Sequence, residues 1–276
     1  MGRRKYSFKS VLLRVLGTLF VLYVLIGSVC WLRLDSMMFH PQDTVFPEQL
    51  KEHLFDLEWN GEKISCLYLK NENASKTILY SHGNAEDIAS RNWIFQEYVK
   101  NGFSVMAYDY PGYGFSSGRP TEAGVYGAAD AAYLYLTEKL GIRPADIVVY
   151  GRSIGSGPSH YLAEKYPVGG LVIECGFTSI VRVGINYSIF PFDAFRNIDR
   201  IQNIHCPVLY FHGEQDTTVP FWHGEKMYSL ANEPKQCLWV PNCGHSNIIQ
   251  TVPEDYWKTL KDFINNLDTL NKNKYE

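Results

Sequence analysis

The sequence lacks any excess of basic residues beyond its first 33 positions, and its six cysteines form no C-x-x-C pair. Beyond residue 33 the chain carries 20 basic and 29 acidic residues, a net charge of −9, so its charge does not favour nucleic acid as a partner. The scattered cysteines also lack the spacing of metal ligands. We therefore expect no metal site and no cofactor, and we infer no disulfide.

Acidic residues are absent from the first 33 positions, which hold six of the 26 basic residues. Residues 1–14 form a basic segment, and residues 15–32 are an uncharged apolar run about long enough to cross a bilayer as a helix. A cleaved signal peptide is the alternative, but the run is long for one and no small-residue cleavage site follows. We favour an uncleaved transmembrane anchor.

The positive-inside rule then predicts a single-pass topology, with the N-terminus in the cytoplasm and the remaining chain on the extracytoplasmic side. The N-x-S sequons at Asn73 and Asn186 would be glycosylation acceptors only if that side is a eukaryotic lumen.

The rest of the chain predicts one folded domain over residues 53–268, preceded by a connector over residues 33–52 and followed by a polar tail over residues 269–276. Two alternating runs around Asn60-Gly61 predict a β-hairpin. Six short apolar runs separated by helical stretches predict a mostly parallel, doubly wound α/β sheet with the hairpin at one edge. These runs are residues 77–81, 103–108, 147–150, 171–175, 208–211 and 236–240.

Residues 151–155, Gly-Arg-Ser-Ile-Gly, fit the G-x-S-x-G pattern of a nucleophile elbow. They lie between a predicted strand and a predicted helix over residues 156–166, which is the context that the pattern requires. A serine on such a turn is held in a strained backbone with its hydroxyl exposed, and the glycines allow close packing around it. Ser153 is therefore the candidate nucleophile, although an ordinary strand-to-helix turn also fits the five residues alone.

An acid and a base are expected on later loops, because this architecture orders its catalytic residues Ser, then Asp or Glu, then His. Asp216, after the run 208–211, is the preferred acid, with Glu214 and Glu174 as weaker candidates. Asp109 precedes the serine, so we expect it to support the structure instead. His245, on the loop after the last predicted strand, is the candidate general base.

Residues 81–85, Ser-His-Gly-Asn-Ala, end the first central strand, where a serine hydrolase places one backbone donor of its oxyanion hole. We assign this donor to Asn84, with Ala85 as the alternative. The second donor is the residue after the nucleophile, Ile154. His82 is expected to hydrogen-bond locally rather than to take part in the chemistry.

An aromatic-rich segment over residues 177–204 is too long for a simple connection between strands. We expect a small cap in which Phe177, Ile180 and Phe190 line an apolar acyl pocket. Packing of these side chains against the domain core is the alternative.

Taken together, these stretches resemble the α/β-hydrolase superfamily over residues 53–268, and more narrowly its membrane-associated depalmitoylases and their single-pass relatives. The resemblance is carried by residues 81–85, 108–114, 116–118, 151–155, 192–199 and 244–245. It implies Ser153, Asp216 and His245 as a catalytic triad and an acyl ester or thioester as substrate. Those depalmitoylases attach to membranes through an acylated N-terminal cysteine cluster, whereas this chain has an apolar span with only Cys30.

We interpret the chain as a membrane-anchored serine hydrolase that cleaves acyl esters or thioesters, in a lipid or an acylated protein, through an acyl-enzyme on Ser153. One alternative is a catalytically silent α/β-hydrolase fold that acts as a membrane-tethered interaction module. The complete Ser, Asp and His set argues against it. Another is a peptidase of the same fold, but no residue set for a peptide terminus is evident in the sequence.

Overall fold

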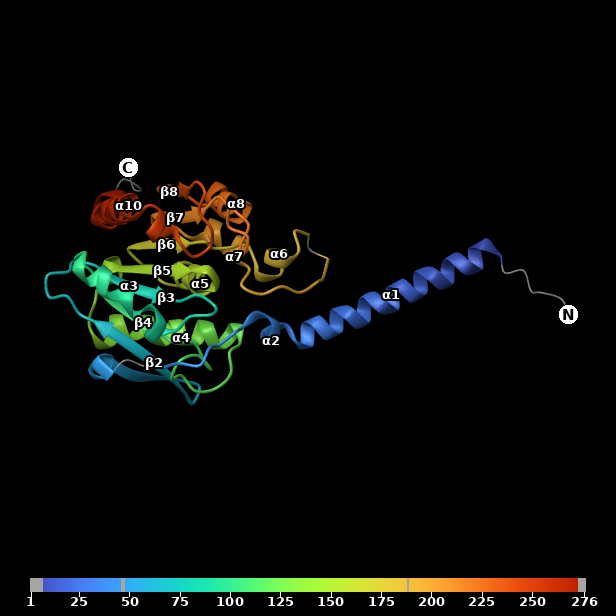
Figure 1. Cartoon of the computed structure of the whole chain (residues 1–276), viewed down its shortest axis with the longest axis horizontal. Helices are drawn as coiled ribbons and strands as arrows, with labels where there is room; N and C mark the ends of the chain where they lie inside the picture. Colours follow the sequence, from blue (N-terminus) through green and yellow to red (C-terminus); the bar gives the residue numbers. More distant parts are fainter. Residues whose placement is uncertain (1–6, 46–47, 188, 273–276) are drawn as a thin grey trace.

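The computed structural model describes residues 7–45, 48–187 and 189–272 of the chain. Its centre is an eight-stranded sheet with the order β1-β2-β4-β3-β5-β6-β7-β8, and helices pack against it (Figure 1). β1 (Leu54–Trp59) and β2 (Glu62–Leu69) form the expected antiparallel hairpin at one edge. The parallel strands are β3 (Thr77–Ser81), β4 (Ser104–Tyr108), β5 (Ile147–Arg152), β6 (Gly170–Glu174), β7 (Val208–Gly213) and β8 (Lys235–Val240).

Each face of the sheet is buried by its own set of helices. α3 (Ile88–Lys100) and α10 (Pro253–Asn265) pack on one face, while α4 (Glu122–Leu134), α5 (Ser156–Lys165) and α8 (Trp222–Leu230) pack on the other. Every residue of β3 to β7 is buried, because helices cover both faces of these strands. The predicted fold class is therefore confirmed, and each predicted run is a strand whose ends differ by at most two residues.

Short helices complete the domain. They are η1 (Glu48–His53), η2 (Tyr135–Lys139), η3 (Pro144–Asp146), η4 (Ser153–Gly155), α6 (Ile180–Gly184), α7 (Asn197–Arg200), η5 (Ile201–Asn203), α9 (Ile248–Thr251) and α11 (Leu267–Lys272). α11 continues the fold into the expected polar tail, and its Leu270 packs against the core. None of the six cysteines, all within the described residues, forms a disulfide.

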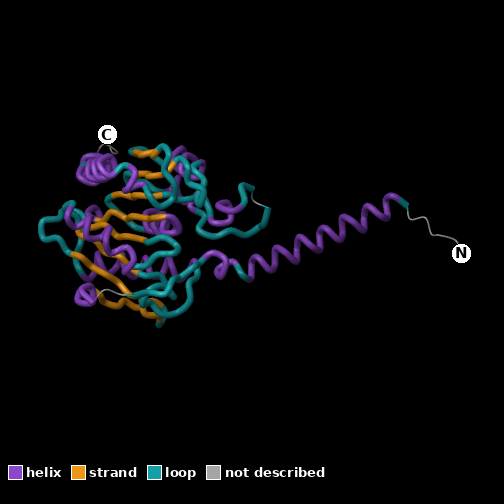
Figure 2. Tube along the Cα trace, viewed as in Figure 1, coloured by secondary structure: helices purple, strands orange, loops and turns teal. Residues whose placement is uncertain are grey.

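A long helix, α1 (Phe8–Leu32), projects from the domain and is followed by α2 (Leu34–Met38) (Figure 1). α1 is long and apolar enough to cross a membrane, by length and composition. It begins seven residues earlier than the uncharged run, so Lys9 and Arg14 of the expected basic segment belong to the helix. α2, at the start of the connector, and the loop that contains α6 lie on the same side of the domain, near the base of α1 (Figures 1 and 2).

Candidate active site

β5 ends in a tight turn whose first residue is Ser153. The φ angle of Ser153 is 53°, in the left-handed region that costs energy for a residue with a side chain. A Cβ atom on Gly151 would lie 2.4 Å from the carbonyl oxygen of Gly155, and one on Gly155 would lie 2.1 Å from that of Ser81. Both positions therefore require glycine, and the close packing expected from the pattern is present.

The three side chains predicted to act together converge at the carboxyl edge of the sheet. Nδ1 of His245 lies 2.7 Å from Oδ2 of Asp216, and its Nε2 lies 3.0 Å from Oγ of Ser153. A carboxylate only accepts hydrogen bonds, so Nδ1 carries the proton. Nε2 is then an acceptor aimed at the serine hydroxyl, which is the arrangement that a general base requires.

Asp216 is held in its orientation by the loop that follows β7. Its Oδ1 accepts the backbone N–H groups of Thr218 and Val219, each at 2.8 Å. Burial opposes ionisation of this carboxyl, but hydrogen bonds from His212 and His245 outweigh that effect and hold its pKa well below the ordinary range. Asp216 is therefore a permanent anion that fixes and stabilises the His245 imidazole.

The other candidate acids do not contact His245. Glu214 is exposed on the same loop, and Glu174 is buried, with its oxygens bonded to the Tyr150 hydroxyl and to Nε of Arg152. Asp109 lies at the end of β4, where its Oδ1 accepts the N–H of Ile88, at the start of α3. This contact agrees with the structural role expected for Asp109.

The loop after β3 adopts a conformation fixed by its polar groups. The Gly83 N–H donates to Oε2 of Glu86, so it is already engaged. The Asn84 side chain is held at both ends: its Nδ2 donates to the Met38 carbonyl, and its Oδ1 accepts the Tyr113 hydroxyl at 2.6 Å. These bonds fix the position of Asn84 beside the turn that carries Ser153. Ile154, the other predicted donor, follows Ser153 in η4 and is buried.

Sequence reasoning missed that the connector after α1 holds this loop. The Met38 carbonyl accepts from Asn84, and the His40 N–H donates to Oδ1 of Asn84 at 3.0 Å. Phe39 packs edge-on against Tyr113 and Phe195. These contacts span more than 40 residues of chain, and only the apolar character of Met38 and Phe39 hinted at burial.

The second feature missed is the role of Arg152, which precedes the nucleophile. Its guanidinium bonds Glu174 through Nε, Glu86 through Nη1 and, through Nη2, both the carbonyl of His245 and Oγ of Ser246. The side chain is buried between these groups. Arg152 thus connects the loops that carry Asn84 and His245 to the nucleophile's own strand. The sequence did offer a signal for this role, because Arg152 is a charged residue in an otherwise uncharged strand and turn over residues 147–155.

His82 hydrogen-bonds locally, as expected. Its Nδ1 donates to the carbonyl of Gly83 at 2.7 Å, and its ring packs 4.0 Å from that of Tyr110. Burial lowers the pKa of His82 and raises the pKa of the neighbouring Asp109 to about 7. The pair lies where β3 and β4 end, outside the hydrogen-bonded group of Ser153, His245 and Asp216.

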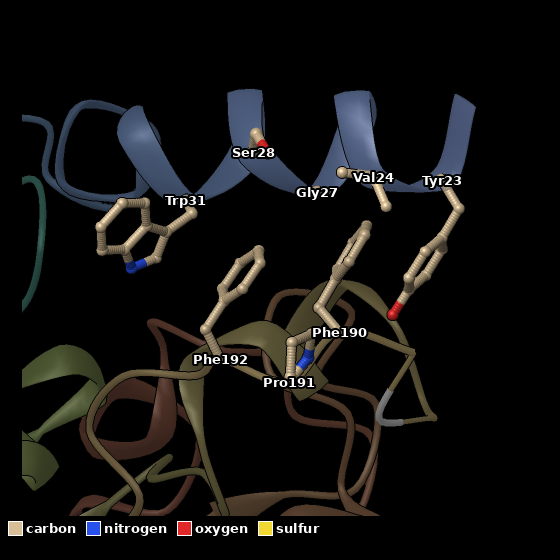
Figure 3. A pocket seen from close by; sticks show the side chains of 8 residues that line it. All are labelled: Tyr23, Val24, Gly27, Ser28, Trp31, Phe190, Pro191 and Phe192. Atoms are coloured by element: carbon tan, nitrogen blue, oxygen red, sulfur yellow. The ribbon is translucent and has the colours of Figure 1, made fainter. Parts of the chain in front are cut away.

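The three residues expected to form an acyl pocket occupy different environments. Phe177 is only 1% exposed and belongs to the core, as the alternative interpretation proposed. Ile180, at the start of α6, and Phe190 line a common apolar cavity at the base of α1. Phe190 also points toward the side of α1 that carries Tyr23 and Gly27 (Figure 3).

Among the described residues, one group of His, Cys and Asp side chains is close enough to hold a metal ion. It comprises Cys175, His212 and Asp216, whose ligand atoms lie within 4.8 Å of one another. The oxygens of Asp216 already bind His245 and two backbone N–H groups. A metal ion there would compete with the contacts that orient His245.

Comparison with known proteins agrees with this architecture. A family model described as alpha/beta hydrolase fold matches residues 76–180. Alpha/beta hydrolase domain-containing protein 17B of Homo sapiens is 37% identical over 211 residues, covering 74% of this chain and 72% of that protein. Protein 17C of Mus musculus is 34% identical over 220 residues, covering 77% and 67%.

Solved structures show the same fold. The esterase Pf2001 of Pyrococcus furiosus superimposes with a TM-score of 0.70 at 18% identity, over 83% of this chain and 97% of that one. The hydrolase GrgF of Penicillium sp. sh18 gives a TM-score of 0.65 at 14% identity, over 76% and 97%. The chain belongs to the α/β-hydrolase family. It is a hydrolase that is more similar in sequence to alpha/beta hydrolase domain-containing proteins 17B and 17C than to these two solved structures.

The contacts of Arg152 predict a positioning role that can be tested with Arg152→Lys. Lysine keeps the positive charge but lacks the planar fork, so it cannot bond Glu86, Glu174 and the His245 loop at once. We expect kcat on a soluble ester to fall about ten-fold or more with a smaller change in KM. Arg143→Lys, at an exposed ion pair with Asp146, is the matched control. Unchanged kcat in a folded Arg152→Lys protein would refute the role.

The raised pKa of Asp109 predicts a pH-dependent stability that Asp109→Asn removes. The folded protein holds the Asp109 proton up to about pH 7, whereas the unfolded chain releases it near its ordinary pKa of 3.8. This stabilisation is complete below that lower value and is lost as the pH rises to 7. Denaturant unfolding in detergent micelles should therefore show the Asn variant gaining on the wild type by up to about 1.4 kcal/mol per pH unit across that window. A constant difference would contradict the argument.

Proposed function

We propose that the protein is a serine hydrolase that cleaves acyl esters or thioesters through an acyl-enzyme on Ser153. The observation that carries the proposal is the continuous hydrogen-bonded chain from Ser153 through His245 to Asp216, at 3.0 and 2.7 Å. The strained turn at Ser153 supports it further, because such strain persists where the surrounding structure holds a functional group in place.

The reaction follows from this geometry. Oγ of Ser153 attacks the acyl carbonyl as Nε2 of His245 takes its proton, and Asp216 stabilises the imidazolium that forms. The backbone N–H groups of Asn84 and Ile154 receive the oxyanion, a contribution worth about 10²–10³ in kcat per donor. His245 then gives its proton to the departing alcohol or thiol. A water molecule, activated by His245, attacks the acyl-enzyme, which releases the carboxylic acid and restores Ser153.

Active-site labelling tests the proposal. A fluorophosphonate probe should label the wild type, and Ser153→Ala should abolish labelling because the attacking oxygen is gone. Asp216→Asn should lower kcat on p-nitrophenyl esters by about 10⁴, as for an acid that fixes the tautomer of the base. Asp109→Asn is the matched control acid and should retain labelling. A folded wild type that neither labels nor cleaves any ester would favour the silent interaction module instead.

We also propose that α1 anchors the hydrolase domain to a membrane, in a single pass with the N-terminus in the cytoplasm. Its 25 residues span about 37 Å as a helix, enough for a hydrocarbon core of about 30 Å. Basic residues at its start, including Lys9 and Arg14, favour the cytoplasmic side. The domain would then act on lipids or acylated proteins on the extracytoplasmic side.

Glycosylation mapping tests this orientation. Asn73 is exposed in the turn between β2 and β3 and begins an N-x-S sequon. If the domain is translocated in a eukaryotic cell, the full chain should gain a glycan that a glycosidase removes and that Asn73→Gln combined with Asn186→Gln prevents. An unmodified chain, together with glycosylation of a sequon added before residue 7, would reverse the proposed topology.

A further inference from the structure

The cap loop, residues 189–192 after α6, lies against the side of α1. The Tyr23 hydroxyl donates to the carbonyl of Ile189 at 2.6 Å, and its ring stacks on Phe190 with centroids 5.9 Å apart. The Phe190 ring packs directly over Gly27, where a Cβ atom would lie 3.4 Å from it, at van der Waals contact (Figure 3). Tyr23 precedes the end of α1 by nine residues, so the loop reaches about 14 Å back along the helix.

This docking places the loop at the depth of the bilayer if α1 is the anchor. The uncharged run from residue 15 to Leu32 is about 27 Å long as a helix, slightly less than the hydrocarbon core. Measured from Phe8, a core of about 30 Å takes about 20 residues of α1, so the helix turn that contains Tyr23 still lies within it. The loop is suited to this place, because Ile185, Tyr187 and Ile189 are 36%, 77% and 48% exposed.

Two apolar cavities lie between this loop and the helices that lead from the membrane. One, of about 250 Å³, is lined by Val24, Gly27 and Trp31 of α1 together with Phe190 and Phe192. The other, of about 320 Å³, is lined mainly by Leu34 and Met38 of α2, Ile180 and Gly184 of α6, and the same two phenylalanines. Neither lining contains a charged side chain. Because both cavities share Phe190 and Phe192, we call them together the α1–cap groove.

The inner end of the α1–cap groove adjoins the candidate oxyanion loop through one shared residue, Met38. Met38 lines the groove, and its carbonyl accepts a hydrogen bond of 2.7 Å from Asn84. The outer end is formed by the apolar helix itself. One residue that lines the groove, Met38, is therefore bonded directly to the residue proposed to bind the oxyanion.

We propose that the α1–cap groove binds the acyl chain of an ester or thioester dissolved in the same bilayer, so that substrate reaches Ser153 laterally from the membrane. This inference rests on the proposed acyl-hydrolase function and specifies its substrate class. An uncharged groove with one wall made by the membrane helix suits a hydrocarbon chain and offers no partner for a polar peptide. The larger of its two cavities, at about 320 Å³, lies in the range of ligand pockets, about 300–1,000 Å³.

The test uses the full chain in phospholipid vesicles with two substrates. One is a long-chain palmitoyl ester held in the bilayer, and the other is p-nitrophenyl acetate in solution. Gly184→Trp fills the groove from a position where a Cβ atom meets nothing within 4 Å, and Gly184→Ala is the matched control. Phe192→Asp is a second variant, which puts a charge into both cavities.

We expect both groove variants to lower the ratio of long-chain to short-chain kcat/KM about ten-fold or more, because the long chain loses the apolar surface on which several of its methylene groups would be buried. Gly184→Ala, the short ester and fluorophosphonate labelling should stay within about two-fold of the wild type. An unchanged ratio in both variants would overturn the groove while leaving the hydrolase proposal intact. Loss of labelling in the wild type would instead remove the hydrolase proposal itself.

A second arm identifies the source of the substrate. The palmitoyl ester is placed either in the vesicles that contain the protein or in separate, protein-free vesicles at the same total concentration. Lateral access predicts faster initial hydrolysis in the shared bilayer by about ten-fold or more, because the substrate never has to leave the lipid. Equal initial rates from the two kinds of vesicle would overturn access from the bilayer.

Discussion

The close approach of three backbone segments at the end of β5 determines the rest of the site. Gly155 lies against the carbonyl of Ser81, and Gly151 against that of Gly155, so that no side chain fits at either position. The contact fixes the turn that holds Ser153 in its left-handed conformation, and it sets the distance from this turn to the loop after β3. The candidate nucleophile and the candidate donor loop, on neighbouring strands, are thereby placed by close backbone packing.

Arg152 extends this constraint to the base. Its buried guanidinium has two carboxylate partners, Glu86 and Glu174, and two further acceptors on the His245 loop. Desolvating such a group is costly, and losing one partner from a buried pair costs about 3–5 kcal/mol, so the network has one favourable arrangement. These bonds hold the loops after β3 and β8 in fixed positions relative to the strand that leads to Ser153.

The sequence allowed the sheet and the three converging side chains to be predicted, because both depend on local patterns and on strand order. Apolar runs mark buried strands whatever packs on them, and parallel strands bring their following loops to one edge. The clamp of Met38 and His40 on Asn84, and the docking of Phe190 on α1, join segments far apart in the chain with no periodic signal. α1 begins at Phe8, before the uncharged run, because Lys9 and Arg14 are compatible with a helix. Their long side chains can carry the charged groups away from the apolar part of the helix.

The anchor and the site are closer in the structure than the length of the connector suggests. A flexible segment of 20 residues, such as residues 33–52, would allow excursions of about 25 Å. Here the chain is already bonded to Asn84 at Met38, six residues after α1 ends, and five of those six form α2. The candidate oxyanion loop is therefore held close to the end of α1. If α1 anchors the protein as proposed, the site is held near the membrane surface, and substrates that remain in the lipid then have an advantage over those that must diffuse to it.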